Sequence, residues 1–346
     1  MINFPQIALL FLLLLIVTAS TVKAEIFVHS VNGKPTLSMD GYFENAPIEV
    51  GMLIHPSMNV NVSHLHQFRV HCGEPGEPVN IINTRQISAL CQHKHSPTTI
   101  RSDGDENYPI IISPRKRTVL ALDQIEWGHR NAAKYQLTLR DFGLGGKTHV
   151  HEIIKPEDGN SSYNIQHYSL NKSQRSNLKR GQKYIIEITN VTTGESSKSD
   201  PGFSGVIQLA TKSDASDIEN NLKIIKQSLH SDALETYFSA IHLRNQAYYA
   251  DSTRALSQTI TSVDPLHRHY LQVKNAQSEG VPLNYLAKKW MDLLAAAVKK
   301  ENAATAALAC IEIRTAYPDL STTWREFLNQ YKNLASFKHY CNLTDL

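Results

Sequence analysis

The residue pattern of this chain changes near Ser213. Before this position, short apolar stretches alternate with Gly, Pro, Asn and Asp, which is typical of strands joined by turns. After it, apolar residues such as Ile218, Leu222 and Ile225 recur every three or four positions, which is typical of amphipathic helices. The sequence therefore predicts a multidomain chain that is β-rich first and α-helical afterwards.

The first residues predict export. Residues 7–17 are an unbroken apolar run, and the small-residue pattern Val22-Lys23-Ala24 fits cleavage after Ala24, so residues 1–24 are interpreted as a signal peptide. The run is shorter than the roughly 20 residues that span a bilayer. Because the residues before it lack Lys and Arg, an uncleaved anchor stays open as an alternative. We expect a periplasmic or secreted protein with no stable membrane span after cleavage.

Length and charge limit the remaining classes. The part after Ala24 is longer than one hydrophobic core usually serves, which favours about two or three domains. The formal net charge is +3, and Lys and Arg are scattered among acidic residues. Since a nucleic-acid surface needs clustered positive charge, we expect no nucleic-acid partner.

Residues 25–107 are predicted to form a first β-rich module. Residues 28–31 lead into the hairpin signal Asn32-Gly33, and residues 48–54 and 68–72 are predicted strands. The segments Val31-Asn32-Gly33, Glu49-Val50-Gly51 and Phe68-Arg69-Val70-His71-Cys72 resemble FecR-type sensory or ligand-binding β-modules. The resemblance covers this first region alone.

Cys72 and Cys91 flank a loop rich in Gly and Pro. In an oxidising compartment such a pair usually forms a disulfide, and closing the loop would contribute about 3 kcal/mol. A metal site is an alternative, because imidazole and thiolate suit zinc or copper. Its candidate ligands, several at the i, i+2 spacing of one strand face, are His64, His66, His71, Cys91, His93 and His95. Unlinked thiols are the third possibility.

Residues 108–212 are predicted to form a β-sandwich. Seven strands are expected over residues 110–113, 119–121, 124–127, 135–139, 149–154, 183–190 and 206–209. Trp127 is expected to fill the centre. The stretch from Leu178 through Gly181 to Tyr184 resembles immunoglobulin-like or fibronectin type III domains, in which such a Tyr bonds back to the backbone at a corner. Arg180 stands where that family usually has Pro.

Residues 213–346 are predicted to be helical. Helices are expected over residues 215–230, 234–246, 249–262, 282–299, 302–317 and 322–334, the first capped by the Ser216-x-x-Glu219 spacing. The segment with Trp290, Leu293, Ala306 and Pro318 resembles a tetratricopeptide repeat. A looser copy would end at Pro265. A generic helical bundle is the alternative.

A second disulfide is also possible within the helical region. Cys310 is expected on a helix, and Cys341 follows the last predicted helix by a few residues. The chain after that helix could therefore fold back and bring the two thiols together.

The chain shows no nucleophile elbow, no HExxH sequence and no phosphate-binding loop that leads into a helix. We therefore expect no enzymatic activity and no cofactor. The whole chain resembles bacterial exported proteins that combine these three kinds of module, which implies a scaffold or adaptor that binds a protein or peptide in the cell envelope. The alternative is a periplasmic metal-binding or metal-sensing protein that uses the His/Cys cluster.

Overall fold

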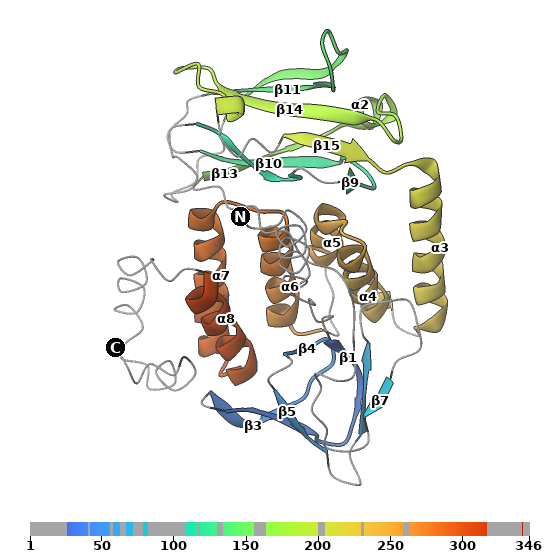
Figure 1. Ribbon diagram of the computed structural model, residues 1–346, viewed down its shortest axis with the longest axis vertical. Coiled ribbons are helices and arrows are strands. Elements are labelled where there is room, and N and C mark those ends of the chain that lie inside the picture. Colours follow the sequence, from blue (N-terminus) through green and yellow to red (C-terminus); the bar gives the residue numbers. More distant parts are fainter. Residues whose placement is uncertain are drawn as a thin grey trace, which may run out of the picture.

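The structure is a computed structural model of the 346-residue chain. It describes residues 26–40, 42–55, 58–62, 67–71, 79–81, 108–115, 118–129, 134–155, 164–199, 205–229, 232–258, 263–316 and 341. N-terminal β-sheets are followed by a C-terminal helical region, so the fold is mixed β then α. In Figure 1 the helices form a middle layer, with the first sheets at one end and a β-sandwich at the other.

The N-terminal strands form two antiparallel sheets. The four-stranded sheet has the order β4-β1-β6-β7, and the three-stranded sheet has the order β3-β2-β5. The strands are β1 (Ile26–Asn32), β2 (Thr36–Met39), β3 (Phe43–Pro47), β4 (Leu53–Ile54), β5 (Asn59–Asn61), β6 (Gln67–His71) and β7 (Val79–Ile81).

Two details of this region were predicted wrongly. Gly33 does make a turn, with φ at 85°, but β1 pairs with β4 and β6 whereas β2 pairs with β3 and β5. The turn therefore joins two sheets and not the arms of one hairpin. Residues 48–54 do not form one strand either, because the chain turns at Gly51, where φ is +84°.

Two further sheets pack face to face as a β-sandwich. One has the order β13-β10-β8 and the other the order β12-β11-β14-β15-β9, in which β9 runs parallel to β15. The strands are β8 (Ile110–Ser113), β9 (Thr118–Val119), β10 (Gln124–His129), β11 (Tyr135–Asp141), β12 (Thr148–Ile154), β13 (Asn164–Ser169), β14 (Lys183–Asn190) and β15 (Val206–Leu209). Both sheets contribute to one buried cluster, which includes Trp127, Leu137 and Ile186.

The predicted strands of the sandwich agree closely with the structure. Residues 110–113, 183–190 and 206–209 have the predicted bounds, and the others shift at their ends. The prediction missed β13 and the short helix α2 (Lys172–Ser176). Strand β13 has mostly polar residues, and it is held by six residue pairs with β10, a tertiary interaction that its own sequence does not signal.

Six helices follow within the described residues. They are α3 (Lys212–Ser228), α4 (Asp232–Asn245), α5 (Tyr249–Leu256), α6 (Pro265–Ser278), α7 (Leu283–Lys299) and α8 (Ala303–Ala316). Helices adjacent in sequence contact one another, so the layer grows by successive hairpins. The predicted helix over residues 322–334 lies outside the described residues.

Two predictions about where helices begin and end were wrong. Helix α3 is capped by Thr211, whose hydroxyl accepts a hydrogen bond from the Asp214 amide at 3.1 Å, and not by Ser216. Pro265 does not close a helical repeat but begins α6, a helix that the sequence analysis missed. Its fixed φ suits the first helical turn, and the side chain of Asp264 caps the helix.

The hydrophobic core joins the N-terminal sheets to the helices. One continuous buried cluster includes Phe27 and Phe68 from the sheets, Tyr237 from α4 and Trp290 from α7. The sandwich keeps a largely separate core. The N-terminal sheets and the helices are therefore packed as one body at their contact, even though more than a hundred residues separate them in sequence.

A disulfide joins Cys310 on α8 to Cys341, with their Cα atoms 5.4 Å apart. Both side chains are fully buried. The second pairing considered from the sequence is therefore present, and it attaches Cys341 to the core of the helical layer. Among the described residues, no helix is both long enough and apolar enough to cross a membrane.

Candidate functional site

Two interfaces hold the three layers together. We call the contact between the N-terminal sheets and the helices the sheet–helix interface, centred on Gly51, Tyr237 and His267. We call the contact between the sandwich and the helices the sandwich–helix interface, centred on Asp251 and Glu279. Each buries ionisable or polar side chains, which makes each a candidate site.

The sheet–helix interface is closely fitted around Gly51. The Tyr237 hydroxyl donates a hydrogen bond of 2.6 Å to the Gly51 carbonyl oxygen. A Cβ atom at position 51 would lie 2.7 Å from Cγ1 of Val263 and 3.1 Å from the Tyr237 ring. Because φ at Gly51 is also positive, a residue with a side chain would have a strained backbone there, and its Cβ atom would overlap Val263.

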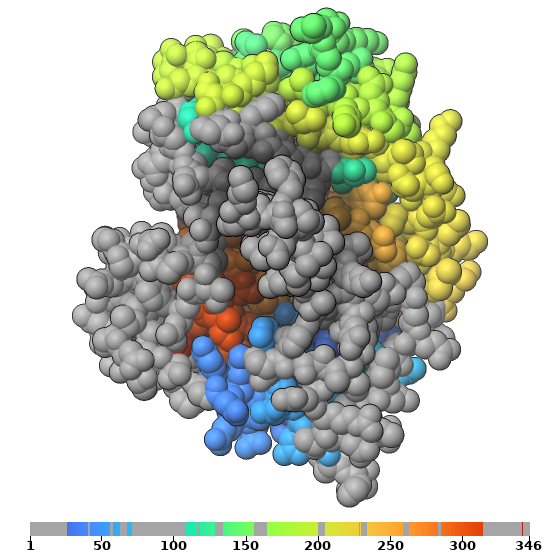
Figure 2. Space-filling view, viewed as in Figure 1, coloured from blue at the N-terminus to red at the C-terminus, as the bar shows by residue number. Residues whose placement is uncertain are grey.

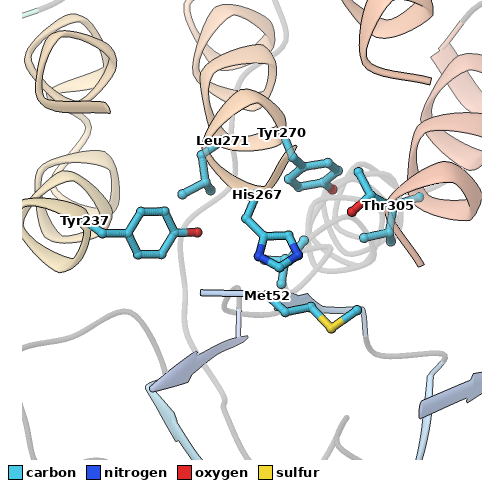
Figure 3. A pocket seen from close by; sticks show the side chains of 8 residues that line it. Met52, Tyr237, His267, Tyr270, Leu271 and Thr305 are labelled. Carbon is cyan, nitrogen blue, oxygen red and sulfur yellow. The ribbon is translucent and has the colours of Figure 1, made fainter. Parts of the chain in front are cut away.

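A small cavity lies in the same interface (Figure 3). Figure 3 shows His267 projecting from α6 toward Met52, with Tyr237 on one side and Tyr270 and Thr305 on the other. Leu53, Leu271 and Leu308 complete the lining. The space has room for about one water molecule.

The electrostatic environment keeps His267 neutral at pH 7. Burial, with a smaller contribution from the positive charge of Lys300, lowers the pKa of His267 to about 4, although Asp264 and a backbone hydrogen bond with Val50 oppose this shift. The Glu49 carboxylate lies 3.9 Å from Nε2 of His267, which is longer than a hydrogen bond. Burial and Asp264 raise the pKa of Glu49 itself.

This arrangement limits the chemistry available at the cavity. A neutral imidazole can act as a general base only when a substrate proton comes within hydrogen-bond reach. The His267 side chain is nearly inaccessible, and the cavity is too small for a substrate molecule. The cavity can therefore hold a water molecule. Because His267 is buried beside it, protonation of His267 would affect the interface.

The sandwich–helix interface is polar on the α5 side. The buried Asp251 carboxylate accepts a hydrogen bond of 2.8 Å from the Leu120 amide, in the loop between β9 and β10. Arg254, one turn along α5, forms ion pairs with Asp251 and with Asp123 of that loop. The Tyr285 ring of α7 covers Gly128 of β10. A Cβ atom at position 128 would lie 2.4 Å from the Tyr285 side chain.

Glu279, at the C-terminal end of α6, is the most perturbed carboxyl group of this interface. Burial raises its pKa to about 8, while Ser113 at the end of β8 and Arg115 just after that strand partly counteract the effect. Arg115 is itself buried and donates a hydrogen bond to the Ile111 carbonyl oxygen. Glu279 is thus protonated over much of the neutral range, and its side chain is buried.

The helical layer also contains a satisfied polar network. Arg244 donates a hydrogen bond of 2.8 Å to the Asn275 side chain, which in turn donates to Ser252 at 3.0 Å. The Ser252 hydroxyl donates to the Ala240 carbonyl oxygen at 2.7 Å. These groups hydrogen-bond one another across α4, α5 and α6, so they fix the helices relative to each other.

The structure describes three sandwich residues that were singled out from the sequence, namely Trp127, Gly181 and Tyr184. Trp127 is fully buried in the sandwich core. Gly181 has φ at +77°, which explains the need for glycine at that turn. The Tyr184 hydroxyl accepts a hydrogen bond of 2.5 Å from the Lys179 amide, so the tyrosine does bond back to the backbone.

The helical residues singled out from the sequence are core residues. Trp290, Leu293 and Ala306 are fully buried where α7 meets its neighbours, and the Trp290 ring contacts Tyr270 edge-on with 5.5 Å between centroids. Pro318 lies outside the described residues.

The predicted metal ligands and the first disulfide cannot be placed. Cys72, Cys91, His64, His66, His93 and His95 lie outside the described residues, and His71 is described only as the last residue of β6. In the part of the chain that the structure describes, no group of three His, Cys, Asp or Glu residues is placed to hold a metal ion. The metal site and the Cys72–Cys91 disulfide stay predictions.

Sequence reasoning missed the polar residues that make the two interfaces. Tyr237 looks like an ordinary core residue of an amphipathic helix, and Glu279 precedes Gly280 at a helix end, where an exposed acid is common. His267 lies in the helix that was not predicted. Only the positive φ of Gly51 had a sequence signal, since glycine favours turns.

No protein-family model and no curated protein matches this chain.

Proposed function

We propose that the protein is a non-enzymatic exported scaffold or adaptor that binds protein or peptide partners in the cell envelope. One observation carries this proposal: buried contacts fix two separate β-rich parts to one helical layer. Tyr237 bonds to Gly51 at the sheet–helix interface, and Asp251 bonds to Leu120 at the sandwich–helix interface. A chain built this way holds distant surfaces at a constant spacing, which is what a scaffold requires.

Three module assignments accompany the proposal. The strand order of the sandwich and the Tyr184 corner support an immunoglobulin-like or fibronectin type III-like domain over residues 108–212. The packing of Trp290 and Ala306 between successive hairpins supports degenerate tetratricopeptide-like helices in residues 213–346. A FecR-like module over residues 25–107 rests on the sequence resemblance alone.

Export rests on the apolar run of residues 7–17 and the cleavage pattern at Ala24. The Cys310–Cys341 disulfide suits the same compartment, because disulfides persist in oxidising surroundings. A periplasmic or secreted location agrees with both.

The partner-binding surface is assigned to the outer edge of the sandwich. The helical face that would hold a peptide in a tetratricopeptide protein is partly used internally, since α4, α6 and α8 pack against the N-terminal sheets. Strand β12 ends the five-stranded sheet and, among the described residues, pairs with β11 alone. Its Ile153 side chain is 63% exposed. An extended peptide could add to this edge through backbone hydrogen bonds.

A pull-down tests the proposal. The full-length exported protein, tagged at its C-terminus, is used as bait in an envelope extract, together with the variant Ile153→Lys. Ile224→Lys is the matched control, because Ile224 is also exposed but lies on α3. We expect one specific protein with wild type and with Ile224→Lys, and its loss with Ile153→Lys. Recovery of no specific protein, or equal recovery with all three, would contradict the proposal.

A further inference from the structure

The hairpin between β11 and β12 carries two exposed apolar side chains at its tip. Phe142 is 56% exposed, and Leu144 is fully exposed. The hairpin projects from the top of the view in Figure 1, on the side of the sandwich away from the helices. Figure 2 shows the green residues of this region at the top of the molecule, so the tip is presented outward. Two large apolar side chains on a convex tip need an explanation, because each costs free energy in water.

The tip has a defined conformation. The Asp141 amide donates to the Lys147 carbonyl oxygen at 2.9 Å, and the Phe142 amide donates to the Lys183 carbonyl oxygen at 3.0 Å. Arg140 donates a hydrogen bond of 3.1 Å to the Gly143 carbonyl oxygen. A Cβ atom at Gly146 would lie 2.3 Å from the Asp141 carbonyl oxygen, so only glycine fits there. The hydrogen bonds and this glycine hold the loop in a shape that presents its apolar residues.

Positive charge surrounds the tip. Lys147 and Lys183 are exposed and adjoin it through the backbone hydrogen bonds just described. The exposed Lys179 lies near Asp141, because the pKa of that carboxyl is lowered mainly by the hydrogen bond with His149 and also by this lysine. Between positions 140 and 149 the single acidic residue is Asp141. Its carboxylate is paired with His149 at 2.7 Å. The apolar tip is therefore bordered by cations, and the one acidic residue of this stretch is already hydrogen-bonded to His149.

We infer that this tip, defined as Phe142 and Leu144 with Arg140, Lys147, Lys179 and Lys183 around it, docks the protein on an anionic lipid bilayer. Apolar side chains flanked by Lys and Arg are the pattern of peripheral membrane binding: the apolar groups enter the acyl region while the cations remain at the anionic headgroups. A protein partner would need a pocket complementary to the projecting tip, whereas a fluid lipid surface accepts it without one. The docking is peripheral and places the partner-binding edge near the membrane surface.

Vesicle flotation tests the inference. The protein used in this test starts at Glu25 and keeps every described residue. The apolar run of residues 7–17 is therefore absent and does not itself bind the vesicles. Wild type is expected to float with mixed phosphatidylcholine–phosphatidylglycerol vesicles and not with phosphatidylcholine alone. Combining Phe142→Ser with Leu144→Ser should weaken binding about tenfold or more, and combining Lys147→Glu with Lys183→Glu should do the same and reduce the salt dependence.

Two controls keep the result interpretable. Ile224→Ser removes an equally exposed apolar side chain from α3 and should bind like wild type. Leu144→Trp places an indole at the tip, whose fluorescence should shift to shorter wavelength when mixed vesicles are added. The inference is overturned if wild type does not float, if the double serine variant floats as well as wild type, or if the indole emission does not move. Cross-linking of a photoreactive residue at position 144 to a protein and not to lipid, in whole envelopes, would also overturn it.

Discussion

The Tyr237 hydroxyl and the Gly51 carbonyl oxygen are 2.6 Å apart although 186 positions separate the two residues in sequence. Gly51 follows the first strands, and Tyr237 lies on α4. The hydrogen bond sits in a buried cluster that includes residues from both regions. The N-terminal sheets therefore share one hydrophobic core with the helical layer.

Replacing Tyr237 with Phe should destabilise the protein. The change removes a buried hydroxyl and leaves the Gly51 carbonyl oxygen without this donor, so we expect a loss of about 1–2 kcal/mol in the free energy of unfolding. Chemical denaturation measures it. Tyr168→Phe is the control, since the Tyr168 hydroxyl donates to Glu152 at an exposed position. Equal effects of the two substitutions would show that the Tyr237 hydrogen bond has no special role.

Gly51→Ala should be more harmful than Tyr237→Phe. Alanine at this position adopts a positive φ and places its Cβ atom 2.7 Å from Val263, which together should cost about 2–4 kcal/mol. Gly145→Ala is a matched control, because Gly145 has φ at +70° but nothing within 4 Å of the added atom. The difference between the two variants in thermal or chemical unfolding isolates the cost of the overlap. No difference would mean that the interface can open to accommodate the methyl group.

The buried carboxyl of Glu279 should make stability fall as pH rises. Its pKa is about 8 in the folded protein, above the ordinary value of 4.5, so the folded state holds an extra proton between these values. The stabilisation is complete below pH 4.5 and is lost as pH rises through 8. We expect wild type to lose stability relative to Glu279→Gln over this window. A constant difference between the two proteins from pH 5 to pH 9 would contradict the assignment.

His267 should have the opposite dependence. Its folded pKa of about 4 lies below the ordinary 6.5, so the unfolded chain takes up a proton first as pH falls. The stability contributed by the neutral ring is complete above pH 6.5 and is lost as pH falls toward 4. Unfolding of wild type and His267→Leu, measured across this window, should show wild type losing stability relative to the variant. Parallel curves would indicate that the ring is solvated.

Local sequence signals predicted the sandwich well. Strand β11 alternates between buried and partly buried residues from Tyr135 to Leu139, and the tyrosine corner at the start of β14 depends on residues only a few positions apart, so both could be inferred from the sequence. The polar strand β13 could not, because its pairing with β10 determines its structure. Pro265 shows a different kind of error: the same residue can follow one helix or begin the next, and the Asp264 cap decides between them.

The interfaces could not be predicted for a physical reason. Tyr237, Asp251 and Glu279 each acquire their role from a partner in a distant part of the chain, namely Gly51, Leu120 and the segment around Arg115. No periodicity or spacing within a single element reports such a contact. In contrast, Cys310 and Cys341 belong to one region, and their pairing could be considered because the chain between them was predicted to turn back.

Hydrogen exchange at β1 and α6 tests the central claim most directly, namely that the N-terminal sheets and the helices form one core. If they do, amides of β1 and α6 open with free energies that agree within about 1 kcal/mol, and Tyr237→Phe lowers both together. The account is contradicted if β1 exchanges through a separate, much easier opening, and if Tyr237→Phe changes exchange in the helices while leaving β1 as it was.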